Sequence, residues 1–158
     1  MSTISPCFWF ESEAEEAATF YASIVPNSEI VHVQRNLADS PSGPAGSVLM
    51  VEFRLGGSRF LSLNGGIRFE YTHAISLSVD CADQTEVHRL WDGLSAGGTV
   101  ERCGWLKDRY GVSWQIVPTI LPKLLGSNDR EKATRAMNAM LQMVKIDIAA
   151  LQAAYDGV

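Results

Sequence analysis

The chain has 158 residues, of which 46% are hydrophobic, with 18 acidic residues against 13 basic ones and a net charge of −5. A chain of this length can bury a core without metal or disulfide support, and its mean hydropathy of +0.02 is typical of a soluble globular protein. The acidic balance disfavours nucleic acid as a partner, because phosphate backbones repel a negatively charged surface.

The sequence contains no run of about 18 apolar residues, and it does not begin with the basic and apolar regions of a signal peptide. We therefore expect no membrane association and a cytoplasmic location. The cysteines, Cys7, Cys81 and Cys103, are odd in number and lack a CxxC spacing. We expect reduced thiols, with neither a disulfide framework nor a zinc cluster.

The first half of the chain combines one helix with four strand-like runs. Residues 5–10 predict a strand, and residues 13–25 predict an amphipathic helix whose start is marked by Ser12 and Glu15 in capping-box spacing. Three further strand-like runs follow at residues 30–37, 49–55 and 59–63. The turn formers of residues 39–46 predict a loop between the first two of these runs.

From residue 74 the same order of elements begins again. A predicted strand at residues 74–79 leads to a helix at residues 84–96, and strand-like runs follow that end at residues 113–117. Asp83 and Glu86 repeat the capping signal. The apolar residues of this second helix then recur with helical spacing, at Val87, Leu90, Trp91 and Leu94.

Alternation along the strands separates a face beneath each helix from a face that no helix covers, because successive strand side chains point in opposite directions. The residues expected beneath the helices are Pro6, Phe8, Phe10, Ile75, Leu77, Val79 and Trp114. Their strand neighbours are expected on the open face.

The repeat predicts an α+β fold made of two βαβββ modules, at residues 1–70 and 71–118, that together form one domain. Paired modules of this kind would build a curved mixed sheet around a cleft. After Pro118 the apolar spacing becomes helical, and residues 119–158 predict a C-terminal helical extension. The methionines of that extension are expected to fill its core or a subunit contact.

With this repeat in view, the chain resembles the vicinal oxygen chelate superfamily, which includes glyoxalase I, extradiol dioxygenases and bleomycin-resistance proteins. It is similar in particular to the PhnB-like branch, also called 3-demethylubiquinone-9 3-methyltransferase-like. The segments that carry the resemblance are residues 9–10, 17–21, 63–66, 75–80 and 104–118, with the Met-rich residues 139–148 of the tail. The resemblance implies the two-module fold and a cleft for a small molecule.

Metal-dependent members of the superfamily place His, Glu or Gln ligands on the opening and closing strands of each half. The resemblance maps these positions onto Ser5, Leu61, Ala74 and Gln115. Alanine and leucine carry no donor atom and serine is a weak ligand, so we expect neither a metal nor another cofactor. His73 precedes a ligand position by one residue, and strand parity predicts that it faces away from the cleft as a structural or surface histidine.

The methyltransferase description is not expected to apply, because the sequence lacks the glycine-rich strand-to-helix turn of a nucleotide-like cofactor site. We instead predict that the cleft binds a small, partly apolar molecule through aromatic, amide and hydroxyl groups. The candidate ligand-binding residues are Cys7, Trp9, Asn64, Ser76, Ser78, Trp105 and Gln115.

A second hypothesis is a metal-dependent lyase or dioxygenase with relocated ligands, drawn from Glu52, His73, Asp108 and Gln115. Lys107, Asp108 and Arg109 could bind an anion, but the resemblance implies that they form the turn before the last strand, and we expect that turn. Binding and catalysis are both compatible with these residues.

Since superfamily relatives commonly pair modules between chains, we also expect a homodimer, sealed by the apolar face of the tail helices.

Overall fold

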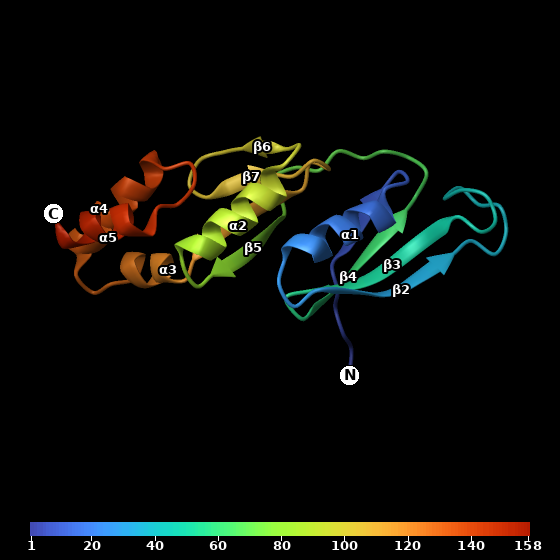
Figure 1. The fold of residues 1–158 in the computed structure, drawn as a ribbon, viewed down its shortest axis with the longest axis horizontal. Coiled ribbons are helices and arrows are strands. Elements are labelled where there is room, and N and C mark those ends of the chain that lie inside the picture. Colours follow the sequence, from blue (N-terminus) through green and yellow to red (C-terminus); the bar gives the residue numbers. More distant parts are fainter. The chain divides into compact units, whose positions relative to one another are not determined.

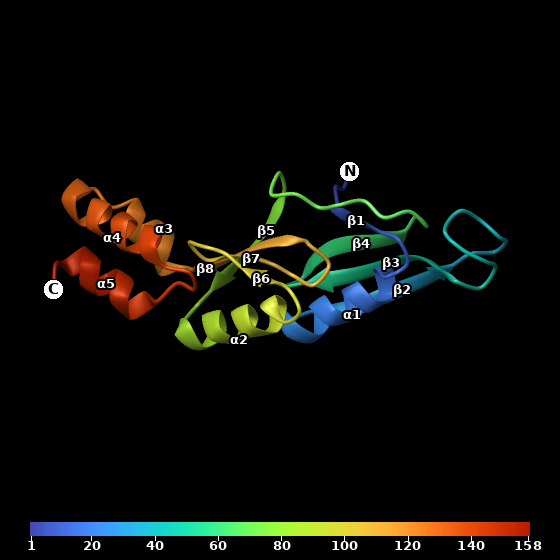
Figure 2. The ribbon, with the colours of Figure 1, turned by 90° about the horizontal axis from the view of Figure 1, so that it is seen from above.

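The computed structural model describes residues 1–158, which form two compact units, Met1–Glu70 and Tyr71–Val158. Each unit contains a four-stranded mixed sheet with one helix packed on one face (Figures 1 and 2). The predicted α+β fold with two βαβββ modules and C-terminal helices is therefore confirmed. None of the helices is long and apolar enough to cross a bilayer.

The first unit has the strand order β1-β4-β3-β2, in which β1 runs parallel to β4 and the other neighbours are antiparallel. Its elements are β1 (Cys7–Phe10), α1 (Ala14–Ile24), β2 (Glu29–Arg35), β3 (Val48–Leu55) and β4 (Ser58–Asn64). These are the predicted elements, with ends displaced by at most two residues.

Helix α1 covers one face of this sheet, and its Ala14, Ala17, Ala18 and Tyr21 are fully buried against that face. Phe8 and Phe10 lie beneath it as predicted, and Phe8 stacks on Phe53 and Phe60 with ring centroids 6.5 and 6.0 Å apart. Pro6 was expected on the same face, but it is exposed because β1 begins only at Cys7.

The predicted capping box of the first helix does not form. Glu13 occupies the N-cap position, without a side-chain capping bond. Instead, the Asn64 Oδ1 accepts a hydrogen bond of 2.8 Å from the Ala14 N–H, and its Nδ2 donates to the Val48 carbonyl at 3.0 Å. A side chain at the end of β4 thus caps the helix, since the parallel register sets Asn64 beside Phe10.

The second unit repeats the arrangement with the strand order β5-β8-β7-β6. Its sheet and helix comprise β5 (Ser76–Cys81), α2 (Gln84–Ser95), β6 (Thr99–Val100), β7 (Trp105–Lys107) and β8 (Ser113–Pro118). All four predicted apolar residues of α2 are buried, and the Asp83 carboxylate accepts the predicted capping bond from the Glu86 N–H at 2.9 Å. Trp114 is also buried as predicted.

The start of β5 differs from the prediction. Residues 73–75 form a turn, in which the Thr72 hydroxyl accepts a hydrogen bond of 3.2 Å from the Ala74 N–H. Ile75 therefore lies outside the strand and is 71% exposed, so its predicted place beneath the helix is wrong. Apolar and polar residues still alternate through this turn, but strand pairing begins only at Ser76. Alternation therefore does not assign the side chains of residues 73–75 to faces of the sheet.

The C-terminal residues form α3 (Ile120–Leu125), α4 (Arg130–Gln142) and α5 (Ile148–Asp156), which belong to the second unit and pack on one another around a core of their own. The Gln84 side chain fixes the linker before α5, because its Nε2 donates to the Ile146 carbonyl at 3.0 Å and its Oε1 accepts from the Ile148 N–H at 2.8 Å. Met140 and Met143 pack against the tail core, as predicted for filler residues.

Candidate functional site

The open face of the second sheet carries a row of side chains from neighbouring strands. Strand register pairs Ser78 with Gln115 and Gln115 with Trp105. Leu106 and Trp114 are buried on the side that α2 covers, so Trp105 and Gln115 point to the other side. Paired side chains on one face lie within contact distance of each other. The fold therefore brings these predicted residues together.

Polar groups beside this row retain hydrogen-bonding capacity. The Gln115 Nε2 donates to the Ser76 hydroxyl at 3.0 Å, and its Oε1 has no partner within the chain. Ser113 lies on the same face, is 1% exposed, and its hydroxyl makes no hydrogen bond. A buried hydroxyl without a partner is unfavourable, so it marks a position where an added polar atom would be stabilised.

His73 lies against the same face, contrary to the parity prediction. Its Nε2 is 2.8 Å from the Glu101 Oε2, and its ring centroid is 6.2 Å from that of Trp105. Parity fails here because His73 belongs to the turn before β5 and not to the strand. Its side chain is 53% exposed, in agreement with the expected surface position.

In the first unit, Cys7 and Trp9 alternate with buried Phe8 and Phe10 and so lie on the open face of that sheet. The Trp9 Nε1 donates to the Ile67 carbonyl at 2.7 Å, which leaves its ring as the part able to contact a ligand. A Cβ at Gly65 would lie 1.8 Å from the Trp9 ring, so only glycine allows this approach. Desolvation raises the pKa of the Cys7 thiol, which disfavours a nucleophilic thiolate.

Asn64 differs from the other candidate residues. Its side chain is buried on the helix-covered side, and both ends of its carboxamide are bound to backbone groups of Ala14 and Val48. This arrangement serves the start of α1. Strand parity had suggested Asn64 for the site, but only the long-range contacts show that its partners are Ala14 and Val48.

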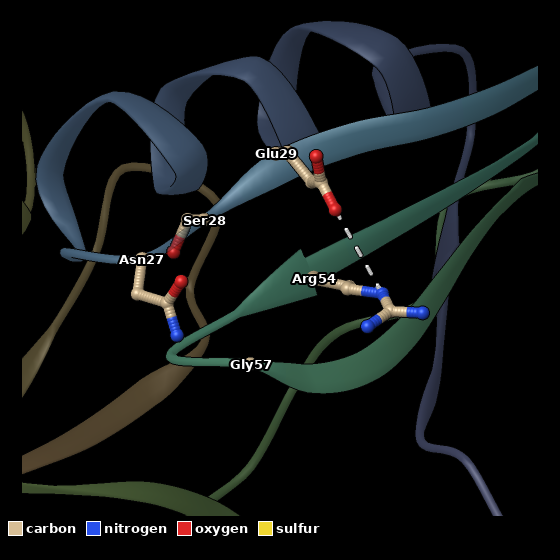
Figure 3. A pocket seen from close by; sticks show the side chains of 5 residues that line it. All are labelled: Asn27, Ser28, Glu29, Arg54 and Gly57. Atoms are coloured by element: carbon tan, nitrogen blue, oxygen red, sulfur yellow. Dashed lines mark ion pairs between the residues drawn. The ribbon is translucent and has the colours of Figure 1, made fainter.

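A polar pocket that the sequence did not indicate lies where the turn after α1 meets the β3–β4 turn (Figure 3). The Ser28 hydroxyl accepts from the Gly56 N–H at 3.2 Å, and Glu29 and Arg54 point toward each other across a separation of 3.9 Å. Asn27 adopts a positive φ of 53° in this turn. The sequence around Asn27 had indicated only the end of the helix.

The donor groups do not fit the metal site of metal-dependent superfamily members. Leu61 and Ala74 carry no ligand atom, and nowhere do three or more His, Cys, Asp or Glu side chains gather closely enough to hold an ion. A hydrogen-bonded Arg59 holds the pKa of Glu52 below its ordinary value and occupies its carboxylate at 2.8 Å.

The Asp108 carboxylate is likewise occupied by hydrogen bonds within the chain. Its buried carboxylate accepts from the Tyr110 N–H at 2.8 Å, the Val112 N–H at 3.1 Å and the Trp114 Nε1 at 2.9 Å. The turn predicted at this position is confirmed. Neither Asp108 nor Glu52 is therefore free to serve as a relocated metal ligand.

Comparison with known proteins agrees with this architecture. Residues 2–117 match the family described as 3-demethylubiquinone-9 3-methyltransferase. The chain belongs to this family. A PhnB protein from Bacillus cereus, 33% identical, superposes with a TM-score of 0.68 over 75% of this chain and all of its own.

More distant structures share the fold. A protein from Pseudomonas aeruginosa is 21% identical, with a TM-score of 0.57 over 75% of this chain and 98% of its own. The fosfomycin resistance protein FosX from Listeria monocytogenes is 12% identical, with a TM-score of 0.54 over 78% and 97%. None of the curated proteins matches the chain. These similarities establish a glyoxalase-like, PhnB-like fold.

Proposed function

We propose that this PhnB-like protein binds a small, partly apolar molecule on the open face of its second sheet, without a metal. The observation that carries the proposal is the row formed by Ser78, Gln115 and Trp105 beside the unpartnered hydroxyl of Ser113. This row contains four of the predicted ligand-binding residues when Ser76, which holds Gln115, is included.

The chemistry of the row suits a flat ligand with polar substituents. The Trp105 indole offers an apolar surface on which a planar group can pack. The free Oε1 of Gln115 can accept a hydrogen bond from the ligand. Such a site binds an apolar body and orients it through a few polar contacts.

A methyltransferase activity is not part of the proposal. Gly56 and Gly57 lie in a strand-to-strand turn, Gly65 and Gly66 follow β4, and Gly97 and Gly98 follow α2. None of these pairs joins a strand to the start of a helix, where the phosphates or ribose of a nucleotide-like cofactor usually bind. The family description therefore does not transfer its activity to this chain.

Binding can be tested by titrating a library of small aromatic compounds into isotope-labelled protein and following amide and indole NMR signals. We expect bound compounds to shift the Trp105 indole and Gln115 side-chain signals. Replacing Trp105 with Ala should weaken their affinity roughly fivefold to tenfold, because stacking is lost. Gln142→Ala, an exposed change on α4, should have no effect. Compounds that bind elsewhere, or equally well to Trp105→Ala, would refute the proposal.

We further propose that the protein is a homodimer and that it acts in the cytoplasm, where its free cysteines stay reduced. Met137, Leu141 and Val144 form one exposed apolar stripe along and just beyond α4, with 49, 41 and 44% exposure. Burying this stripe between two copies would remove apolar surface from water.

Sedimentation equilibrium should then give twice the chain mass of 17.3 kDa. Leu141→Glu should shift the equilibrium toward monomer, because a carboxylate would have to be buried in the contact. Asn138→Glu, one residue beyond Met137 and exposed, provides the control. A monomer of the unaltered protein at all working concentrations would exclude the dimer.

A further inference from the structure

We propose that His73 and Glu101 form a metal-free proton-transfer pair that acts on a molecule bound beside Trp105. His73 is the general base, and Glu101 is the positioning residue. The inference rests on the proposed binding function of the same face and adds a reaction to it. The molecule it requires is flat and carries a proton acidified by an electron-withdrawing group.

The contact between the two side chains fixes which nitrogen of the neutral imidazole carries the proton. Both Glu101 oxygens face the His73 Nε2, at 2.8 and 3.1 Å. An ionised carboxylate only accepts hydrogen bonds, so Nε2 must carry a proton. The lone pair of the neutral ring then resides on Nδ1, which has no partner within the chain. An imidazole held in this way is prepared to accept a proton.

The location of the pair connects it to the binding row. His73 precedes β5 at one edge of the sheet, and Glu101 follows β6 at the opposite edge. The Glu101 N–H also donates to the Trp105 carbonyl at 2.9 Å, which continues the cross-strand row of Trp105, Gln115 and Ser78. A flat molecule on Trp105 would therefore lie beside the imidazole, whose centroid is 6.2 Å from the indole.

Surface ion pairs of this kind contribute little to stability. What distinguishes this pair is its surroundings. The indole of Trp105, the free Oε1 of Gln115 and the unpartnered Ser113 hydroxyl lie on the same face. A base, a group that orients it and polar groups for the ligand are the components of a proton-transfer site.

The reaction can be tested with 5-nitrobenzisoxazole, a flat probe whose opening reports on a general base. The His73 Nδ1 would take the proton from the ring carbon, the C–H electron pair would form the nitrile, and the N–O bond would break to give a phenolate. The imidazolium then releases its proton to water, so no oxidant, reductant or co-reactant is needed. The phenolate is followed by its absorbance.

We expect the purified protein to accelerate this reaction, and His73→Ala to lower kcat/KM roughly 100-fold. Added imidazole should restore part of the lost rate in His73→Ala. Glu101→Gln should lower kcat several-fold and leave KM unchanged, since the probe still binds but the base is no longer oriented. His88→Ala, which removes another exposed histidine, should match the unaltered protein. Unfolding curves would confirm that each variant is folded.

The NMR signals of Trp105 and Gln115, recorded with the probe, separate the two proposals. Shifts at these residues combined with an unchanged rate in His73→Ala would overturn the proton-transfer pair and leave the binding function intact. If the probe binds but no acceleration is seen in the unaltered protein, the pair is likewise refuted. Absence of shifts at both residues, with this probe and with every compound of the library, would overturn the binding function together with the pair.

Discussion

Replacing Asp108 with Ala is expected to lower the free energy of unfolding of the second unit by about 4 kcal/mol, because three donors would lose a charged acceptor. Its carboxylate binds the Tyr110 and Val112 N–H groups and the Trp114 indole N–H, and only 3% of the residue is exposed. Alanine would leave these three donors without the carboxylate that binds them. Chemical denaturation followed by Trp fluorescence measures the change.

Two variants calibrate this result. Asp108→Asn retains one side-chain oxygen as an acceptor and should lose less stability than alanine does. Asp92→Ala removes an exposed carboxylate that pairs with Lys145 at 3.0 Å, and it should change stability by less than about 1 kcal/mol. If Asp108→Ala resembled Asp92→Ala, the carboxylate would not be holding the turn, and its availability as a ligand would have to be reconsidered.

Replacing Asn64 with Ala should destabilise the first unit by about 2–3 kcal/mol. The reason is that the Ala14 N–H and the Val48 carbonyl lose their partners at the same time. We expect the hydrogen exchange of the α1 amides to accelerate, since the start of that helix has no other side-chain cap. Asn138→Ala, at an exposed position of α4, supplies the control.

The same variant tests the assignment of Asn64. At temperatures where Asn64→Ala remains folded, compounds that bind beside Trp105 should retain their affinity, because the Asn64 carboxamide belongs to the first unit and is bound there to backbone groups of Ala14 and Val48. A specific loss of affinity in folded Asn64→Ala would instead return this residue to the binding site.

Several features were predictable because they depend on neighbours in the chain. The capping signal of Asp83 and Glu86 acts within four residues, and the four buried residues of α2 lie within eight. The alternation of β1 also separated buried Phe8 from open-face Trp9 correctly. The Ser12 signal had the same local form but failed, because Asn64, fifty residues away in the chain, supplies the acceptor instead.

The sequence by itself determined the duplicated βαβββ architecture, the family and most of the strand faces, because periodicity, caps and turn formers are short-range properties. Only the tertiary structure decided which polar groups meet. His73 and Glu101 are 28 residues apart, and Gln84 and Ile146 are 62 apart. Such contacts depend on the sheet edges and turns that folding brings together, and a local sequence pattern does not identify these distant partners.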